Sequence, residues 1–461
     1  MQPSERRPNI LLFIPHDLGD HLRCYGHASV RSPNLDRLAS RGVRFTDYFT
    51  AAPECTPSRA GMFTGLYTHQ NGLMGLTHRG WELNPDAEHL AKRLWRGGYQ
   101  TYLFGWQHEA GGAASELGYN HLLSQRNCRA AAVCDEAAAF VQSPAACGAK
   151  PWFACLGFIE VHRPWSEETP FSPEAVEVPA YLPDNPATRT DLARFHHSIE
   201  QMDTAVGRVL DALEKSPAAQ DTIVIFTTDH GIPFPRAKST FYDAGIRLPF
   251  IIRRPGRIDG GRTVGQLLSN LDLCPTLLEA AGLPVPDGLE GRSFWPLLGG
   301  RLYKEREEVC GALFYDSCYD PMHMVRTRRY KYIRSFAVTP EDARGADAAT
   351  LARHKRGLWI RADDSDVQSS LTWQSIEPGG PFPMPPAEEL YDLENDPLEQ
   401  NNRADDPALA PVLGDLRARL RAMMERSHSP LLHGHVSPDL SRTRNMHWSA
   451  FMAQQGRNKK A

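Results

Sequence analysis

The stretch Asn9-Ile10-Leu11-Leu12-Phe13-Ile14, followed at once by Pro15-His16-Asp17, decides the fold class. An unbroken apolar run of this length is typical of a strand buried on both faces in a parallel sheet. Similar runs recur later in the chain, at 99–104, 152–158, 222–227 and 248–252. Segments with helical spacing lie between them, at 32–40, 90–96 and 191–215. Strands that alternate with helices predict an α/β fold, with a large, mainly parallel sheet flanked by helices.

Histidine and aspartate residues follow directly after four of these apolar runs. They are His16 and Asp17, His108, His162, and Asp229 and His230. In an open α/β sheet, ligands bind in the crevice beyond the carboxyl ends of the strands. One histidine after one strand would be an ordinary turn residue, but four such strand ends predict a shared polar site.

The segment 52–65 adds a cysteine to this set. Cys55 precedes Pro57 by two residues and Arg59 by four. The fixed φ of Pro57 suits a first helical turn, so Cys55 is expected at or just before a helix N-terminus. Backbone N–H groups, the helix dipole and the Arg59 guanidinium all favour an anion there. This is the layout of a reactive group beside an oxyanion; the alternative is a small buried hydrophobe, the common fate of a free cysteine.

The polar candidates include a donor set for a divalent metal, formed by Asp17, Asp229 and His230. Carboxylate oxygens suit Ca²⁺ or Mg²⁺, whereas a histidine nitrogen favours Mn²⁺ or Zn²⁺. Such a site is built for substitution at sulfur or phosphorus, with a histidine to protonate the leaving oxygen. The groups that would meet an anion beside the metal are Arg59, Lys238, His108 and His162.

Length and composition limit the other classes of function. The 461 residues suffice for one large domain and a smaller one, and the net charge of −4 provides no basic footprint for nucleic acid. The sequence shows neither a signal peptide nor an apolar run long enough to span a membrane, so we expect a cytoplasmic protein with no membrane partner. The nine cysteines are odd in number and include no CxxC pair, which predicts reduced thiols. A homo-oligomer is left open.

The character of the chain changes near residue 307. Short segments typical of antiparallel strands follow, at 308–314, 322–327, 330–333 and 389–393, and then a helix at 409–424. The polar segment 340–370 is expected to be a surface insertion. The three predicted parts are a catalytic α/β domain over residues 1–306, a C-terminal α+β subdomain built on an antiparallel sheet over 307–440, and a basic tail or arm over 441–461.

Several of these segments resemble the motifs of the sulfatase family, which belongs to the alkaline phosphatase superfamily. The run Cys55-Thr56-Pro57-Ser58-Arg59 resembles the family's formylglycine motif without a gap. The other resembling segments are 7–19 and 228–231 for the two metal loops, 32–39 for the helix after the first loop, 238–249 for the run Lys-x-x-x-Tyr-x-x-Gly-x-Arg-x-Pro, and 389–401 for the C-terminal pattern. The segment 68–76 is similar to the heparan N-sulfatase (sulfamidase) branch. The resemblance implies the alkaline-phosphatase-like fold.

The resemblance also implies a mechanism. A formylglycine-generating enzyme would oxidise Cys55 to an aldehyde, one hydroxyl of its hydrate would attack sulfur, and the other would then lose its proton and expel sulfate. The implied substrate is a small sulfated or sulfamated molecule, with a sugar as one option. The implied metal is one divalent ion, held by Asp17, Asp229, His230 and the modified Cys55. The family implies Ca²⁺, with Mn²⁺ or Mg²⁺ as alternatives. The residues implied to line the sulfate pocket are Arg59, His108, His162 and Lys238.

Two positions depart from the family pattern. His16-Asp17 stands where the family has paired aspartates, so His16 is expected either to coordinate the metal or to lie behind a ligand, with coordination favoured. Gly105-Trp106-Gln107-His108 stands where the family has Gly-Lys-Trp-His. We expect Gln107 to replace the missing lysine as a neutral donor to the substrate.

Three rival functions remain open at this point. A phosphonate monoester hydrolase or phosphodiesterase of the same superfamily would use the same nucleophile. A degenerate sulfatase fold, retained for binding without catalysis, would explain the changes at His16 and Trp106. A thiol hydrolase would use unmodified Cys55 with a histidine as its base.

Overall fold

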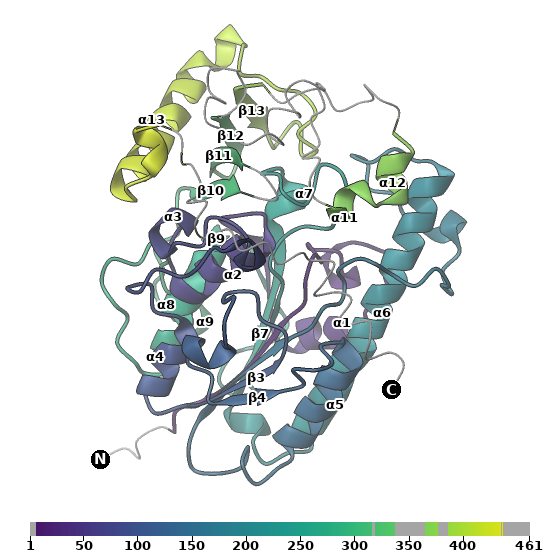
Figure 1. Ribbon diagram of the computed structural model, residues 1–461, viewed down its shortest axis with the longest axis vertical. Helices are drawn as coiled ribbons and strands as arrows, with labels where there is room; N and C mark the ends of the chain where they lie inside the picture. The colour runs from purple at the N-terminus through teal and green to yellow at the C-terminus, as the bar shows by residue number, and fades with distance from the viewer. Residues whose placement is uncertain (1–5, 316–318, 337–364, 377–385, 435, 437–461) are drawn as a thin grey trace.

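The computed structural model describes residues 6–315, 319–336, 365–376, 386–434 and 436. These residues form two β-sheets, and the smaller sheet lies above the larger in Figure 1. The predicted tail at 441–461 and most of the predicted insertion at 340–370 lie outside the described residues. All eight cysteines in the described part of the chain are free. Within that part, no helix has both the length and the apolar character needed to cross a membrane.

The larger sheet has nine strands, and its centre follows the predicted parallel pattern. Strand β1 pairs in parallel with β5 on one side and β6 on the other, so that Leu12 lies opposite Cys155 and Ile225. Strand β7 runs antiparallel to both of its neighbours, so the sheet is mixed at that edge. In spatial order the strands are β4 (His121–Leu123), β3 (Gln100–Gly105), β5 (Trp152–Gly157), β1 (Asn9–Ile14), β6 (Thr222–Thr227), β7 (Arg247–Arg253), β2 (Val43–Phe49) and β8 (Arg262–Val264), with β9 (Leu268–Ser269) also pairing with β2.

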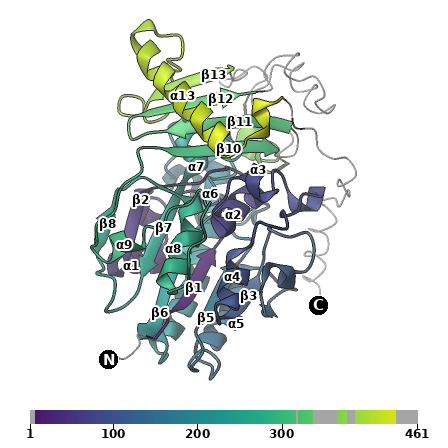
Figure 2. The ribbon, with the colours of Figure 1, turned by 90° about the vertical axis from the view of Figure 1, so that its left-hand side faces the viewer.

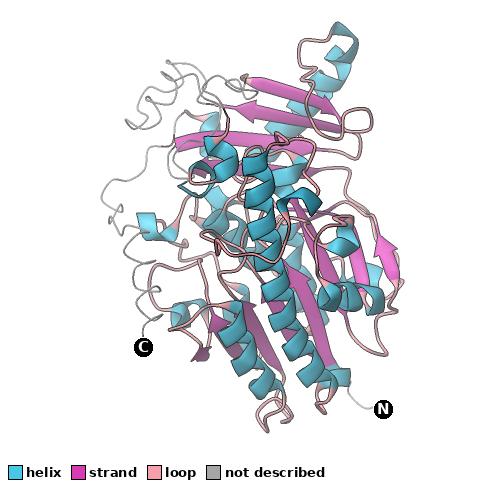
Figure 3. Cartoon of the chain, turned by 90° about the vertical axis from the view of Figure 1, so that its right-hand side faces the viewer, coloured by secondary structure: helices cyan, strands magenta, loops and turns pink. Residues whose placement is uncertain are grey.

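Helices cover both faces of this sheet, which explains why its central strands are apolar throughout. The long helices α5 and α6 lie side by side against one face (Figure 3), and α4 and α8 lie against the other (Figure 2). The helices of the first face are α1 (Pro33–Arg41), α5 (Ala130–Val141) and α6 (Pro186–Glu214); those of the second are α2 (Cys55–Thr64), α4 (Leu90–Arg96) and α8 (Leu273–Ala280). Short helices elsewhere are α3 (Thr68–Asn71), α7 (Asp243–Ile246), α9 (Trp295–Leu298), α11 (Ser365–Gln368) and α12 (Leu371–Gln374).

The smaller sheet is antiparallel and carries one helix. Its strands in order are β10 (Val309–Tyr315), β11 (Tyr319–Arg326), β12 (Tyr330–Ser335) and β13 (Glu388–Asp392). Helix α13 (Ala410–Arg426) packs across β11 and β12 (Figure 2) through apolar side chains such as Leu416 and Leu420. The predicted fold class, a large and mainly parallel α/β sheet with a smaller antiparallel sheet, is confirmed.

A buried charge cluster connects the two sheets. Asp243, at the start of α7, accepts hydrogen bonds from Arg326 on β11 at 2.9 Å and from Lys331 on β12 at 2.6 Å. Lys331 is fully buried and also lies 2.6 Å from Glu399. A buried charge without its partner is strongly destabilising, so these pairs fix the smaller sheet against α7.

Replacing Leu12 by alanine should test the central strand. Leu12 is fully buried on β1, whereas Leu302 is 98% exposed, so the same substitution at Leu302 is a matched control. We expect Leu12→Ala to lower the free energy of unfolding by about 2–5 kcal/mol, because it opens a cavity in the core. Leu302→Ala should change it by less than about 0.5 kcal/mol. Urea denaturation followed by circular dichroism measures both, and equal effects would contradict the buried position of β1.

Candidate active site

The polar residues that follow the central strands meet at one edge of the larger sheet. Strands β3, β5, β1 and β6 are neighbours in that order, so their carboxyl ends lie next to one another. His16 Nδ1 lies 2.9 Å from Asp229 Oδ2, and His230 Nε2 lies 3.1 Å from Asp17 Oδ1. His162 Nε2 lies 3.9 Å from Asp17 Oδ2. The predicted meeting of these strand ends is confirmed.

The backbone at Asp17 is bent to make this arrangement. Asp17 has a φ of 55°, a left-handed conformation that is uncommon for a residue with a side chain. Its N–H donates to Asp229 Oδ1 at 3.0 Å, which ties the loop after β1 to the loop after β6. Such conformations persist only where the surroundings hold them, and they gather at functional sites.

Cys55 is the first residue of α2, as the position of Pro57 predicts. Its N–H donates to the carboxylate of Glu54, the residue that caps the helix. Its Sγ lies 3.2 Å from His230 Nε2 and 3.9 Å from Asp17 Oδ1. Burial raises the pKa of the Cys55 thiol well above its ordinary value, which makes an unmodified thiolate a poor candidate for the nucleophile.

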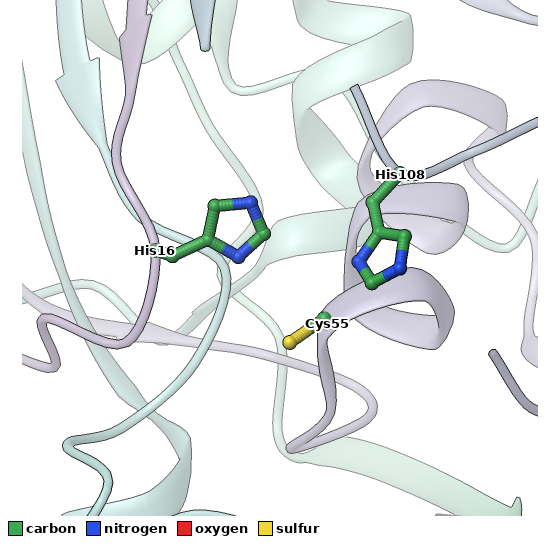
Figure 4. A group of neighbouring side chains, drawn as sticks. All are labelled: His16, Cys55 and His108. Carbon is green, nitrogen blue, oxygen red and sulfur yellow. The ribbon is translucent and has the colours of Figure 1, made fainter. Parts of the chain in front are cut away.

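Two further histidines border Cys55. Figure 4 shows His16 on the loop after β1 and His108 on the loop after β3, with both rings directed towards the space beside Cys55. The ring centroids of His16 and His108 are 6.0 Å apart, and a nitrogen of each ring lies within 4.8 Å of the Cys55 sulfur. His108 also stacks on His78, a residue that the sequence did not single out.

The donor atoms fit a divalent metal. Atoms from four buried residues, His16, Asp17, Cys55 and Asp229, all lie within 4.8 Å of one another. Asp229 Oδ2 has no aligned hydrogen-bond donor among the described residues. His230 donates its Nδ1–H to the carbonyl of Gly231, so Nε2 is the ring atom that faces this group and that would bind a metal. Asp229 Oδ2 also lies 2.9 Å from His16 Nδ1 and 3.6 Å from Arg59 Nη1. Two buried carboxylates, one with an oxygen that lacks an aligned hydrogen bond, and an oriented imidazole suit a cation.

Arg59 and Lys238 lie on either side of the carboxylates. Arg59 is fully buried, and its Nη1 lies 3.6 Å from Asp229 Oδ2. Lys238 donates to Asp17 Oδ2 at 3.1 Å. Burial alone raises the pKa of Asp17, but Lys238, His162 and His230 outweigh it and hold the pKa below its ordinary value. Asp17 is therefore ionised, and both cations lie close enough to hold an added anion.

The sequence missed Glu109, which orients Arg59. Its Oε1 accepts from Arg59 Nε at 2.6 Å, and both side chains are 1% exposed. Glu109 directly follows His108, so its place beside a predicted site residue was a usable signal. Since the Glu109 carboxylate engages Nε, the terminal nitrogen Nη1 of Arg59 faces His16 and Asp229.

The sequence also missed Asp366, which comes from α11 in the C-terminal part of the chain. Its Oδ2 lies 2.7 Å from Lys238 Nζ and 3.0 Å from His162 Nε2. Burial lowers the pKa of His162, but the carboxylates of Asp366 and Asp17 outweigh it and raise the pKa to about 9.

The prediction of a surface insertion is wrong for this end of 340–370, because Val367 and Ser370 are buried. No local pattern around Asp366 marks it as a site residue.

Gln107 is not brought into this group. Its amide oxygen accepts from the N–H groups of Glu109 and Ala110, and its amide nitrogen donates to the carbonyl of Ala110. The side chain is thus folded onto its own turn. This geometry holds the loop that carries His108 and does not support the expected role of Gln107 as a donor to the substrate.

Comparisons with known proteins agree with this geometry. The Sulfatase family model matches residues 8–283, and the model described as N-sulphoglucosamine sulphohydrolase, C-terminal, matches residues 234–344. The chain is 28% identical to the human N-sulphoglucosamine sulphohydrolase, over 92% of this chain and 91% of that protein. It is 30% identical to an ulvan-active sulfatase of Formosa agariphila, over 87% of this chain and 76% of that protein.

Solved structures share the fold. A structure of a 2-O GAG sulfatase superposes with a TM-score of 0.71 at 23% identity, covering 95% of this chain and 96% of that one. The phosphonate monoester hydrolase of Agrobacterium radiobacter superposes with a TM-score of 0.69 at 22% identity, covering 91% and 96%. The fold is therefore common to both kinds of enzyme. Because the Sulfatase model spans more than half of the chain, the protein belongs to the sulfatase family and is a sulfuric ester hydrolase.

Proposed function

We propose that this protein releases inorganic sulfate from a sulfated or sulfamated sugar, with a formylglycine made from Cys55 as the nucleophile and one divalent metal. The observation that carries the proposal is the place of Cys55, at the first residue of α2 and against the buried Asp17 and His230. The match to the C-terminal model and to the human N-sulphoglucosamine sulphohydrolase supports an amino sugar as substrate.

The metal would be held by Asp17, Asp229 and His230, with residue 55 and His16 completing the donor set. Ca²⁺ suits the carboxylate oxygens, and Mn²⁺ or Mg²⁺ are the alternatives if the histidines coordinate. When bound, such an ion supplies positive charge for the sulfate oxygens. The two carboxylates are ionised without it, so the site is ready to take a cation.

A formylglycine hydrate at position 55 supplies the hydroxyl group for attack on sulfur. Arg59 and Lys238 hold the negative charge of the sulfate, and their fixed positions mean that little reorganisation is needed as charge moves between oxygens. His162 donates Nδ1–H to the carbonyl of Arg163 at 2.6 Å, so its Nε2 is the atom that holds a proton for the leaving group.

Replacing Cys55 by alanine should abolish sulfate release, because no other side chain in the group can become an aldehyde. Cys274→Ala is the matched control, since Cys274 is a free, buried cysteine on α8, outside this group. We expect the control to retain activity. Ion chromatography of sulfate released from N-sulfoglucosamine and from an aryl sulfate measures both variants, in protein co-produced with a formylglycine-generating enzyme.

The rival function is tested with the same preparation. A phosphonate monoester hydrolase would show a higher kcat/KM on an aryl phosphonate monoester than on either sulfated substrate. That result, or full sulfate release by Cys55→Ala, would overturn the proposal.

Removal of the metal should stop the reaction. Treatment with a strong chelator, followed by removal of the chelator–metal complex, is expected to reduce sulfate release to background, since Asp17 and Asp229 then repel the substrate anion. Adding Ca²⁺ should restore the rate, and Mg²⁺ and Mn²⁺ serve as comparisons. Full activity in protein shown by elemental analysis to be free of metal would contradict the donor set.

Asp366 should favour sulfamates over sulfate esters. A carboxylate only accepts hydrogen bonds, so beside Lys238 and His162 it can receive the bridging N–H of a sulfamate but not the bridging oxygen of an ester. The two substrates carry the same charge, so the contribution of Arg59 and Lys238 to binding the sulfo group cancels in their ratio. We expect Asp366→Asn to lower the ratio of kcat/KM for sulfamate over ester about tenfold, the size of one hydrogen bond to a charged group.

The control for this variant is Asp405→Asn, at an exposed aspartate outside the site. It should leave the ratio unchanged. An unchanged ratio in Asp366→Asn as well would show that Asp366 does not read the bridging atom.

A further inference from the structure

The loop after β1 continues past Asp17 into a second cluster of polar side chains, Asp20, His21 and His27. A 3-10 turn, Arg23–Tyr25, ends at Gly26 with a φ of 108° and brings His27 back onto His21. The two imidazole rings stack with centroids 3.8 Å apart and planes 22° apart. His27 Nε2 lies 3.2 Å from Asp20 Oδ1, and His21 Nδ1 lies 3.9 Å from the same oxygen.

His21 is the buried member of this cluster. It is 5% exposed, and neither Nδ1 nor Nε2 makes a hydrogen bond to any described residue. The hydroxyl of Tyr181 and Nδ1 of His196 are also buried beside the cluster, and neither makes a hydrogen bond to a described residue. Leaving a buried polar group without a partner is costly, so several such groups beside one cluster indicate a ligand.

The cluster borders a small cavity. Its volume is about 170 Å³, and Asp20, His21, His27 and Tyr181 are among its lining residues. The side chains of Asp20 and His27 are 26% and 28% exposed, so an ion could enter from solvent. The three donor atoms lie within 4.8 Å of one another.

We propose that Asp20, His21 and His27 form a second divalent-metal site, which takes Zn²⁺ or an ion of similar preference such as Co²⁺. Two imidazole nitrogens and one carboxylate oxygen are the donors that zinc favours, whereas Ca²⁺ needs more oxygens. Ligands of a tetrahedral zinc lie about 3.3 Å apart, close to the 3.2 Å between His27 and Asp20. The distance of 3.9 Å from His21 Nδ1 to the same oxygen requires a contraction of about 0.6 Å.

Neighbouring charges do not exclude a cation. Arg247 and Arg236 line the same cavity. Arg247 donates to Asp243 at 2.6 Å and lies 3.6 Å from Asp47, and Arg236 donates to the carbonyl of Glu399 at 2.7 Å and lies over the Tyr242 ring. Burial, with His27 and His196 nearby, lowers the pKa of His21 well below its ordinary value, so its ring is neutral at pH 7. A neutral imidazole is the form that binds a metal.

The metal at this site would stabilise the loop and take no part in the reaction. Asp20 is three residues from Asp17, and His27 follows the turn, so one ion would cross-link the two ends of this loop. The Asp17 loop would then be held independently of the ion at Cys55.

Titration of the full-length protein with Co²⁺ tests this assignment, after the Cys55 site has been saturated with Ca²⁺. We expect one equivalent of Co²⁺ to bind, with visible absorption bands of low-coordinate Co²⁺, and Zn²⁺ to displace it. His27→Ala should weaken binding at least about tenfold and remove the bands. His27 is partly exposed, so this variant should fold; Asp20→Asn is a second variant with the same expected loss.

His197→Ala is the matched control, because His197 is a partly exposed histidine on α6, outside the cluster. It should bind Co²⁺ as the parent protein does. Absence of Co²⁺ binding, or equal binding in His27→Ala, Asp20→Asn and the control, would overturn the proposal. Binding of inorganic sulfate in place of Co²⁺, lost in the same variants, would also overturn it and assign the cavity to an anion.

Discussion

Two carboxylates buried side by side, Asp17 and Asp229, are the constraint that the rest of this site satisfies. Both are fully buried, and buried like charges repel unless nearby cations compensate for them. Lys238 compensates Asp17 and Arg59 lies beside Asp229. The acceptor atoms that remain in excess include Asp229 Oδ2, which receives no aligned hydrogen bond from a described residue, and this excess is the physical reason to expect a metal there.

The topology of the larger sheet positions these groups. Parallel strands end at the same edge, so β1 and β6 present their aspartates together and β3 and β5 add one histidine each. The helix that starts at Cys55 then directs its N-terminus at the same edge. The C-terminal part of the chain completes the arrangement with Asp366, which couples the anion-binding groups to α11.

The central strands and the site residues that follow them were predictable from the sequence. A strand buried on both faces has an unbroken apolar run, and the polar residue after the run marks the end of the strand. The direction of β7 was not predictable, since an apolar pattern carries no information on strand polarity. Helix α5 (Ala130–Val141) was missed because its alanine-rich face shows little amphipathic contrast. Gln107 was predicted to contact the substrate because of its place in a motif. In the structure its amide oxygen instead accepts hydrogen bonds from the backbone N–H groups of Glu109 and Ala110. Asp366 depends on tertiary folding alone, and no pattern in the sequence could reveal it.

The proposed mechanism depends on the chemical state of residue 55. The most direct measurement is the mass of the tryptic peptide 45–59, from protein co-produced with a formylglycine-generating enzyme and shown to release sulfate. The proposed mechanism predicts a peptide that is lighter by the mass difference between a cysteine thiol and an aldehyde. The fraction of peptide with this mass should rise in proportion to the specific activity of the preparation. An unmodified cysteine throughout an active preparation would contradict it, and the nucleophile would then have to be sought elsewhere.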